Sequence, residues 1–196
     1  MSICIKDQIQ NMNIVIGCTV GCAYCYARNN VKRWHMIDDF ADPEFFPGKL
    51  KMMEKKRPQN FFLTGMSDFS GWKPDWRDEI FAKIRENPQH QFLFLTKQPD
   101  LLKKLGRVTV SWSINTLDEN FKNDMDSASS IERRIAAMKQ VYEAGIRTVC
   151  FVFPVFPGIT DFEAIFERVK NQCDLFWLEN LNLRGGFKKT IMDYIA

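Results

Sequence analysis

Three cysteines, Cys18, Cys22 and Cys25, fall within eight residues in the spacing C-x3-C-x2-C. Thiolates are soft ligands that favour iron–sulfur clusters or zinc. A cubic [4Fe-4S] cluster bound by only three cysteines has one iron without a protein ligand. An open coordination position is typical of a catalytic metal site, whereas a closed site with four protein ligands is usually structural. The spacing therefore favours an enzyme with an open metal centre.

Zinc is the alternative for these cysteines, with a distant fourth ligand such as His35. Zinc sites usually combine two closely spaced ligand pairs, and the sequence offers no second pair of cysteines. The remaining cysteines lie far apart in the chain, and we expect each to be a small core residue. They are Cys4, Cys150 and Cys173.

The composition is that of an ordinary globular protein, with 45% hydrophobic and 26% charged residues among 196. This length fits a single domain over residues 1–196. The net charge of +3 is too small to indicate nucleic-acid binding by itself. No apolar run approaches the roughly 18 residues that span a bilayer, and the N-terminus does not resemble a signal peptide. We therefore expect a cytoplasmic protein that does not contact a membrane.

Short β-rich runs alternate with helical patterns along the chain. We expect strands over residues 13–16, 60–64, 91–96, 108–114, 147–153 and 175–179. We expect helices within 47–56, from Asp75, from Pro99 to Gly106, after capping boxes at Ser129–Glu132 and Thr160–Glu163, and from Phe187. We also expect a polar connection over residues 28–39 and a break in the fifth strand at Pro154. Six such units in series predict an α/β fold, a parallel sheet with helices outside, as a partial (β/α)6 TIM-like barrel.

Residues that can bind ligands stand directly after several expected strands. The carboxyl ends of parallel strands meet at one edge of the sheet, where ligands bind in such folds. These residues are the three cysteines, Thr64 to Asp68, Thr96 and Lys97, Asn115, and Glu179 with Asn180. The fourth strand places Val110, Trp112 and Ile114 on one face and Thr109, Ser111 and Ser113 on the other. A polar face on such a strand indicates a lumen that holds a polar cofactor.

The cysteine loop after a first strand, with Tyr24 just before the third cysteine, resembles the radical SAM superfamily. Thr64-Gly65-Met66-Ser67-Asp68 lies where that family has its glycine-containing loop. The commoner form there is Gly-Gly-Glu, and the variant resembles the spore photoproduct lyase branch, as does Thr96-Lys97 after the third strand. The near-minimal length resembles the small "mobile pair" radical SAM proteins, which occur beside a second radical SAM protein.

The resemblance implies two cofactors, a [4Fe-4S] cluster and S-adenosyl-L-methionine. Cys18, Cys22 and Cys25 would bind three irons, and S-adenosylmethionine would chelate the fourth through its amino and carboxylate groups. Thr64 and Gly65 would approach the amino group, with Ser67 or Asp68 as its acceptor. The cofactor carboxylate would pair with Lys97. Ser111, Ser113 and Asn115 would contact ribose or carboxylate, and Tyr24 and Tyr26 would border the adenine.

The implied activity is reductive cleavage of S-adenosylmethionine to a 5′-deoxyadenosyl radical, which abstracts a hydrogen atom from a substrate that the sequence does not reveal. The alternative is a partner-dependent iron–sulfur subunit that binds S-adenosylmethionine without independent turnover. The implied partners are a reductant such as flavodoxin or ferredoxin, and either a second radical SAM protein or a macromolecular substrate.

Overall fold

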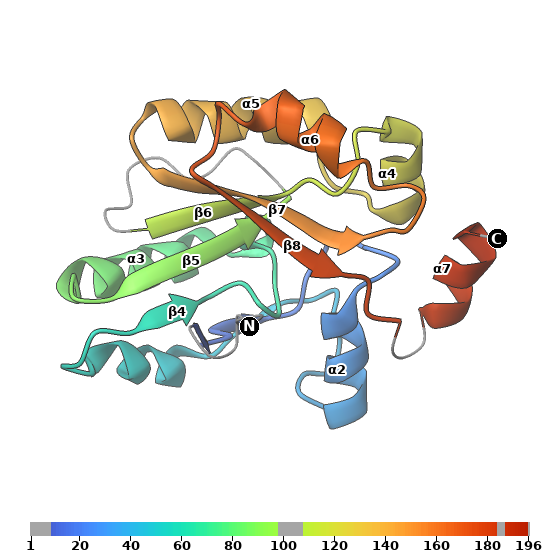
Figure 1. Ribbon diagram of the computed structural model, residues 1–196. Helices are drawn as coiled ribbons and strands as arrows, with labels where there is room; N and C mark the ends of the chain where they lie inside the picture. The colour runs from blue at the N-terminus through green and yellow to red at the C-terminus, as the bar shows by residue number, and fades with distance from the viewer. Residues whose placement is uncertain (1–8, 98–107, 184–186, 196) are drawn as a thin grey trace.

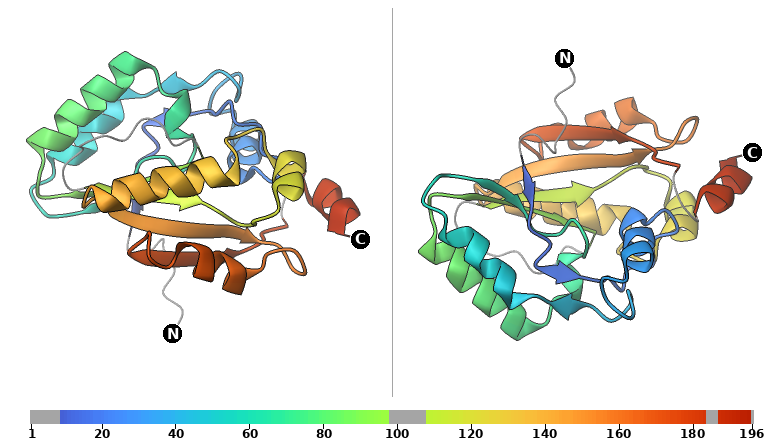
Figure 2. Two further views of the ribbon diagram at one scale, coloured as in Figure 1. Left: turned by 90° about the horizontal axis from the view of Figure 1, so that it is seen from above. Right: turned by 90° about the horizontal axis from the view of Figure 1, so that it is seen from below.

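The computed structural model describes residues 9–97, 108–183 and 187–195. Its central feature is a six-stranded sheet in the order β1-β4-β5-β6-β7-β8, in which every neighbouring pair is parallel (Figure 1). The strands are β1 Gln10–Asn11, β4 Asn60–Phe62, β5 Gln91–Thr96, β6 Val108–Ser113, β7 Arg147–Val155 and β8 Leu175–Asn180. The order in the chain equals the order in the sheet, and the curved sheet forms a half-barrel (Figure 2). The predicted partial barrel is confirmed.

Helices cover the outer face of the sheet, with α5 and α6 over β6 to β8 and α3 beside β5 (Figure 1). The α-helices are α2 Tyr26–Trp34, α3 Pro74–Glu86, α4 Glu119–Met125, α5 Ile131–Glu143, α6 Phe162–Val169 and α7 Lys188–Ile195, and the 3-10 helices are η1 Pro47–Glu54 and η2 Phe69–Gly71. Among the described residues, none of these helices combines the length and the apolar character needed to cross a membrane.

The main core lies between the sheet and these helices. Val110 and Trp112 of β6 are fully buried there, together with Ile80 of α3 and Ile135 of α5. Cys150 of β7 pairs in register with Trp112 and belongs to the same core. Because side chains alternate along a strand, the hydroxyl-bearing residues of β6 face the inner, concave side. The predicted division of β6 into two faces is confirmed.

The first predicted strand, residues 13–16, is only partly correct. Val15–Ile16 form β2, which pairs antiparallel with β3, Glu44–Phe45, in a separate two-stranded sheet. The strand that joins the main sheet is β1, which pairs with β4. Asn13 has φ 44, in the left-handed region, and this turn separates β1 from β2.

The predicted connection over residues 28–39 is wrong, because the helix α2 occupies its first part. Ala27 and Val31, four residues apart, are buried on one face of α2. The thiol of Cys25 accepts a hydrogen bond from the backbone N–H of Arg28 and so caps the first turn. Helix α4 was not predicted either, and its cap is Asp118, whose carboxylate accepts from two backbone N–H groups.

Several predicted boundaries shift. Strand β7 continues through Pro154 to Val155, and its ladder with β8 shifts register between Val152 and Val155. The caps of α5 and α6 are Ser130 and Asp161, one residue after the predicted Ser129 and Thr160. The expected helix within 47–56 is 3-10. The helix expected from Pro99 to Gly106, and Cys4, lie outside the described residues.

Candidate active site

The cysteine loop joins β2 to α2 and begins with a tight turn. Gly17 has φ 107, and a Cβ there would lie 2.7 Å from the Cα of Pro43, so only glycine fits. The backbone N–H of Gly17 donates to the carbonyl of Met66 at 3.0 Å, and that of Cys18 donates to the carbonyl of Phe40 at 2.7 Å. These contacts attach the start of the loop to the segment that follows β4, through Met66, and to the connection between α2 and β3, through Phe40.

The three predicted cluster ligands lie together on this loop as free, partly exposed thiols. Burial raises the pKa of Cys18 to about 12, with a further contribution from Asp68, and burial raises the pKa of Cys22 to about 11. The thiols of Cys18 and Cys22 are therefore protonated at neutral pH, and iron binding would release their protons.

Among the described residues, no three His, Cys, Asp or Glu side chains are grouped so that they could hold one metal ion. A zinc site needs its ligands around a single ion. In a cubane cluster each thiolate binds a different iron, so the three sulfurs need not converge on one point. The free thiols of Cys18, Cys22 and Cys25 thus suit a cluster by their chemistry and shared loop.

The loop after β4 is held by its own side chains. Thr64 Oγ1 accepts a hydrogen bond from the backbone N–H of Leu95 at 2.7 Å, and Ser67 Oγ accepts from Trp72 Nε1 at 3.0 Å. The buried carboxylate of Asp68 accepts from four donors, namely Ser70 N and Oγ, Thr96 Oγ1 and Lys97 N. These three side chains therefore fix the shape of the loop and join it to β5.

Gly65 lies at the tip of this loop, close to the turn at Asn13. A Cβ on Gly65 would stand 2.9 Å from Asn13 Oδ1. That oxygen is buried and has no hydrogen-bond partner among the described residues. The hydroxyl of Tyr26 donates to the carbonyl of Gly65 at 2.5 Å. Gly65 has no side chain to block access, and Asn13 Oδ1 beside it is an acceptor without a partner among the described residues. This pair therefore suits a ligand that carries a hydrogen-bond donor.

Lys97 stands at the carboxyl end of β5, beside the cysteine loop. Its ammonium donates to Ser113 Oγ at 2.6 Å and lies 5.4 Å from the centre of the Tyr24 ring. Burial by itself lowers the pKa of Lys97, but nearby Tyr24, Cys22 and Asp126 outweigh that effect and raise it. The lysine is therefore cationic at neutral pH, and an ammonium with three donors can also bind an anion.

The end of β6 supplies a second unpaired polar atom. Asn115 is buried, and its Nδ2 donor has no hydrogen-bond partner among the described residues. Ser111 and Ser113, also buried, precede it on the concave face of the same strand. An unsatisfied buried donor costs free energy unless a ligand pairs with it.

The structure thus brings nearly all the predicted site residues to one rim of the half-barrel. The chain is therefore a (β/α) protein whose cysteine loop lies at the carboxyl ends of its strands. The chain belongs to the radical SAM superfamily, whose sequence model matches residues 12–169. Membership in this superfamily implies an iron–sulfur cluster and the cleavage of S-adenosylmethionine to a radical.

Several known proteins are similar to this chain in sequence or in fold. An uncharacterized protein of Methanocaldococcus jannaschii is 30% identical over 188 residues, which cover 89% of this chain and 71% of the relative. A spore photoproduct lyase variant with bound AdoMet and dinucleoside spore photoproduct superimposes with a TM-score of 0.74 at 19% identity. The alignment covers 97% of this chain and 62% of that one. SuiB of Streptococcus suis bound to S-adenosylmethionine gives a TM-score of 0.63 at 13% identity, over 96% of this chain and 46% of that one.

Sequence reasoning missed Asn13, which lies at this rim, and Asp126, which lies behind it. Asn13 has the left-handed backbone that asparagine tolerates better than most residues, which is a weak signal in a sequence. Asp126 accepts a hydrogen bond from the hydroxyl of Tyr24, 102 residues earlier in the chain, and no local pattern marks it.

Proposed function

We propose that this chain is a radical S-adenosylmethionine enzyme that binds a [4Fe-4S] cluster through Cys18, Cys22 and Cys25. The observation that carries the proposal is the meeting of three free thiols, a cationic lysine and two unpaired buried polar atoms at one rim. When bound, the cluster supplies the electron that cleaves S-adenosylmethionine to a 5′-deoxyadenosyl radical, which abstracts a hydrogen atom from the substrate.

The residues of the rim fit the polar groups of S-adenosylmethionine. Asn13 Oδ1, beside the half-buried backbone of Gly65, would accept from its amino group, while the ammonium of Lys97 would pair with its carboxylate. Asn115 Nδ2, next to Ser113, would donate to a ribose hydroxyl or a carboxylate oxygen. The bonds of Thr64, Ser67 and Asp68 within the protein would hold this cradle in shape before the ligand arrives.

The aromatic residues of the cysteine loop would limit access of water to the reacting centre. Tyr24 is buried, and burial raises its pKa to about 12, so its phenol is neutral at neutral pH. Tyr24 packs edge-on against Phe156 with ring centres 5.6 Å apart, which leaves its ring as a fixed wall. In such an enzyme the cofactors provide the reactivity, while the protein orients them and excludes water. The packing of Tyr24 would serve this second role.

Anaerobic reconstitution of the chain tests the proposal. We expect about four irons and four sulfides per chain, and 5′-deoxyadenosine after reduction in the presence of S-adenosylmethionine. The variant Cys22→Ala should lose both, whereas Cys173→Ala, at a buried cysteine near the end of α6, should retain both. Zinc in place of iron, or a cluster that survives in Cys22→Ala, would overturn the assignment.

The open sides of the half-barrel favour a second candidate, a subunit whose turnover depends on a partner. Strand β8 ends the sheet order, and Leu175 and Leu178 on it are 42% and 47% exposed. A second radical SAM protein or a macromolecular substrate would cover this edge, and a flavodoxin or ferredoxin would deliver the electron. Release of 5′-deoxyadenosine by the isolated chain with a chemical reductant favours the independent enzyme, and release only after a partner is added favours the subunit.

A further inference from the structure

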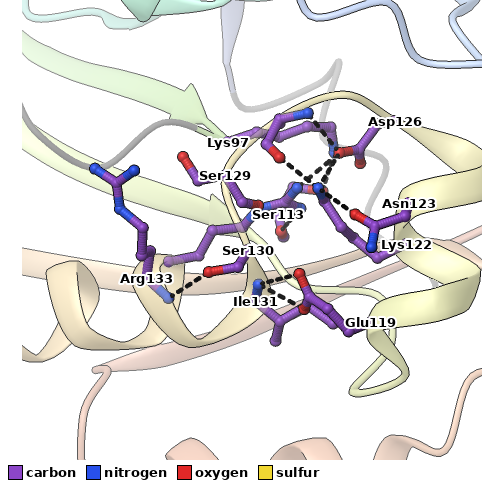
Figure 3. A network of polar contacts seen from close by, with 12 residues as sticks. Lys97, Ser113, Glu119, Lys122, Asn123, Asp126, Ser129, Ser130, Ile131 and Arg133 are labelled. Atoms are coloured by element: carbon purple, nitrogen blue, oxygen red, sulfur yellow. Dashed lines mark hydrogen bonds and ion pairs between the residues drawn. The ribbon is translucent and has the colours of Figure 1, made fainter.

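A network of polar and charged side chains lies at the end of α4 (Figure 3). At its centre is Asp126, whose side chain is 1% exposed. Its Oδ1 accepts hydrogen bonds from Arg134 Nη2 at 2.8 Å and from the backbone N–H of Ala128 at 3.0 Å, and Lys122 Nζ lies 3.7 Å away. Its Oδ2 accepts from the hydroxyl of Tyr24 at 3.3 Å.

The segment around Asp126 is attached to the cysteine loop in three places. Besides the bond from Tyr24, the backbone N–H of Ala23 donates to the carbonyl of Met125 at 2.8 Å, and the N–H of Ser127 donates to the carbonyl of Val20 at 3.2 Å. Tyr24 stands between two of the predicted ligands. The position of these ligands therefore depends on where the end of α4 lies.

The network also reaches Lys97, at the end of β5. The guanidinium of Arg134, buried in the same network, donates through Nη1 to the carbonyl of Ser113 at 3.1 Å. The hydroxyl of Ser113 in turn accepts from Lys97 Nζ, which lies over the Tyr24 ring. The contacts form a closed ring of five residues, Tyr24, Asp126, Arg134, Ser113 and Lys97.

A buried carboxylate is tolerated only when its oxygens are paired. Arg134 and Lys122 already neutralise Asp126 through Oδ1. The hydroxyl of Tyr24 pairs the second oxygen, Oδ2, without adding charge compensation, because the phenol is neutral. The physical effect of this contact is to hold the hydroxyl end of Tyr24 in place, and the Lys97 ammonium lies 5.4 Å from the centre of that ring.

We propose that Asp126 is a positioning residue of the active site, which orients Tyr24 and thereby the cysteine loop and the Lys97 ammonium for cofactor binding. This inference rests on the proposed function, because it assigns Asp126 a role toward the cluster and S-adenosylmethionine. Asp126 itself does not reach the rim; it acts through the hydroxyl of Tyr24.

The test compares Asp126→Asn, Tyr24→Phe and the double variant, with Asp124→Asn as the matched control. Asp124 is the exposed neighbour on α4 that accepts from the Tyr194 hydroxyl at 2.8 Å. We expect Tyr24→Phe, which removes only the hydroxyl, to weaken S-adenosylmethionine binding about tenfold and Asp126→Asn at least as much. The double variant should be no weaker than Asp126→Asn, because both changes break one contact.

A second readout separates positioning from folding. S-adenosylmethionine added to the reduced cluster should change its electron paramagnetic resonance spectrum, and we expect this change to be altered in Tyr24→Phe while the unfolding midpoint stays near that of the wild type. If Asp126→Asn does not fold, Tyr24→Phe alone decides. Wild-type affinity and spectrum in Tyr24→Phe would overturn the inference, whereas a wild-type chain that binds no cluster would overturn the proposed function itself.

Discussion

The carboxylate of Asp68 accepts hydrogen bonds from the hydroxyl of Thr96 at 2.9 Å and from the backbone N–H of Lys97 at 2.8 Å. The loop after β4 and the end of β5 are thereby joined through one side chain. Two of the proposed contacts of the methionyl group, Gly65 and Lys97, flank this junction. The geometry of the cofactor site therefore depends on a residue whose oxygens are used within the protein.

We expect Asp68→Asn to lower both stability and cofactor affinity. An amide in this place would direct an NH2 group at one of the N–H or O–H donors that Asp68 now accepts, so at least one buried bond is lost. The expected loss is about 1–3 kcal/mol in the free energy of unfolding, measured by denaturant titration, with weaker S-adenosylmethionine binding by calorimetry. Asp78→Asn, on an exposed position of α3, is the control. Equal stability of the two variants would show that Asp68 does not join the strands.

Replacement of Lys97 by methionine should weaken the binding of S-adenosylmethionine. Methionine keeps most of the packing against Tyr24 but removes the charge that would pair with the cofactor carboxylate. A charge-assisted hydrogen bond of about 1.5–3 kcal/mol corresponds to roughly a 10- to 150-fold rise in Kd. Lys73→Met, which removes an ammonium 4.8 Å from the Trp76 ring, should leave Kd unchanged. An unaltered Kd in Lys97→Met would assign the carboxylate to another residue.

The turn at Gly17 predicts a large difference between two glycine substitutions. Gly17→Ala combines a φ of 107 with a Cβ 2.7 Å from the backbone of Pro43. We expect it to destabilise the chain by about 2 kcal/mol or more and to reduce the iron bound per chain. Gly48→Ala should change stability by less than about 1 kcal/mol, because nothing lies within 4 Å of its Cβ. Similar unfolding midpoints for the two variants would contradict this account of the loop.

The position of Cys150 predicts that this thiol takes no part in the chemistry. It is fully buried on the face of β7 that packs against the helices, in register with Trp112. Cys150→Ala should cost about 1–2 kcal/mol of stability through lost packing. Iron content and the rate of 5′-deoxyadenosine formation per folded chain should stay at the wild-type level. A loss of turnover at unchanged stability would instead place this cysteine in the reaction.

Local patterns in the sequence were sufficient for the cysteine loop and for most of the sheet. The spacing of Cys18, Cys22 and Cys25 predicts a cluster without knowledge of the rest, because ligands within eight residues are brought together by one turn. The alternation in β6 predicts its buried and concave faces, because the period of two is a property of the strand itself. The same patterns misplaced β1 and overlooked α2, since short elements depend on pairing and capping partners.

Only the tertiary structure decided how the site is supported. Asn13 meets Gly65, and Asp126 meets Tyr24, across loops whose packing no local rule describes. The family resemblance implies Ser67 or Asp68 as the acceptor for the cofactor amino group, and only the structure shows that both side chains already make hydrogen bonds within the protein. The physical reason is that hydrogen bonding and burial depend on which groups come within about 3 Å of each other. Residue type and spacing determine what chemistry is possible, while packing determines which side chain is left free to perform it.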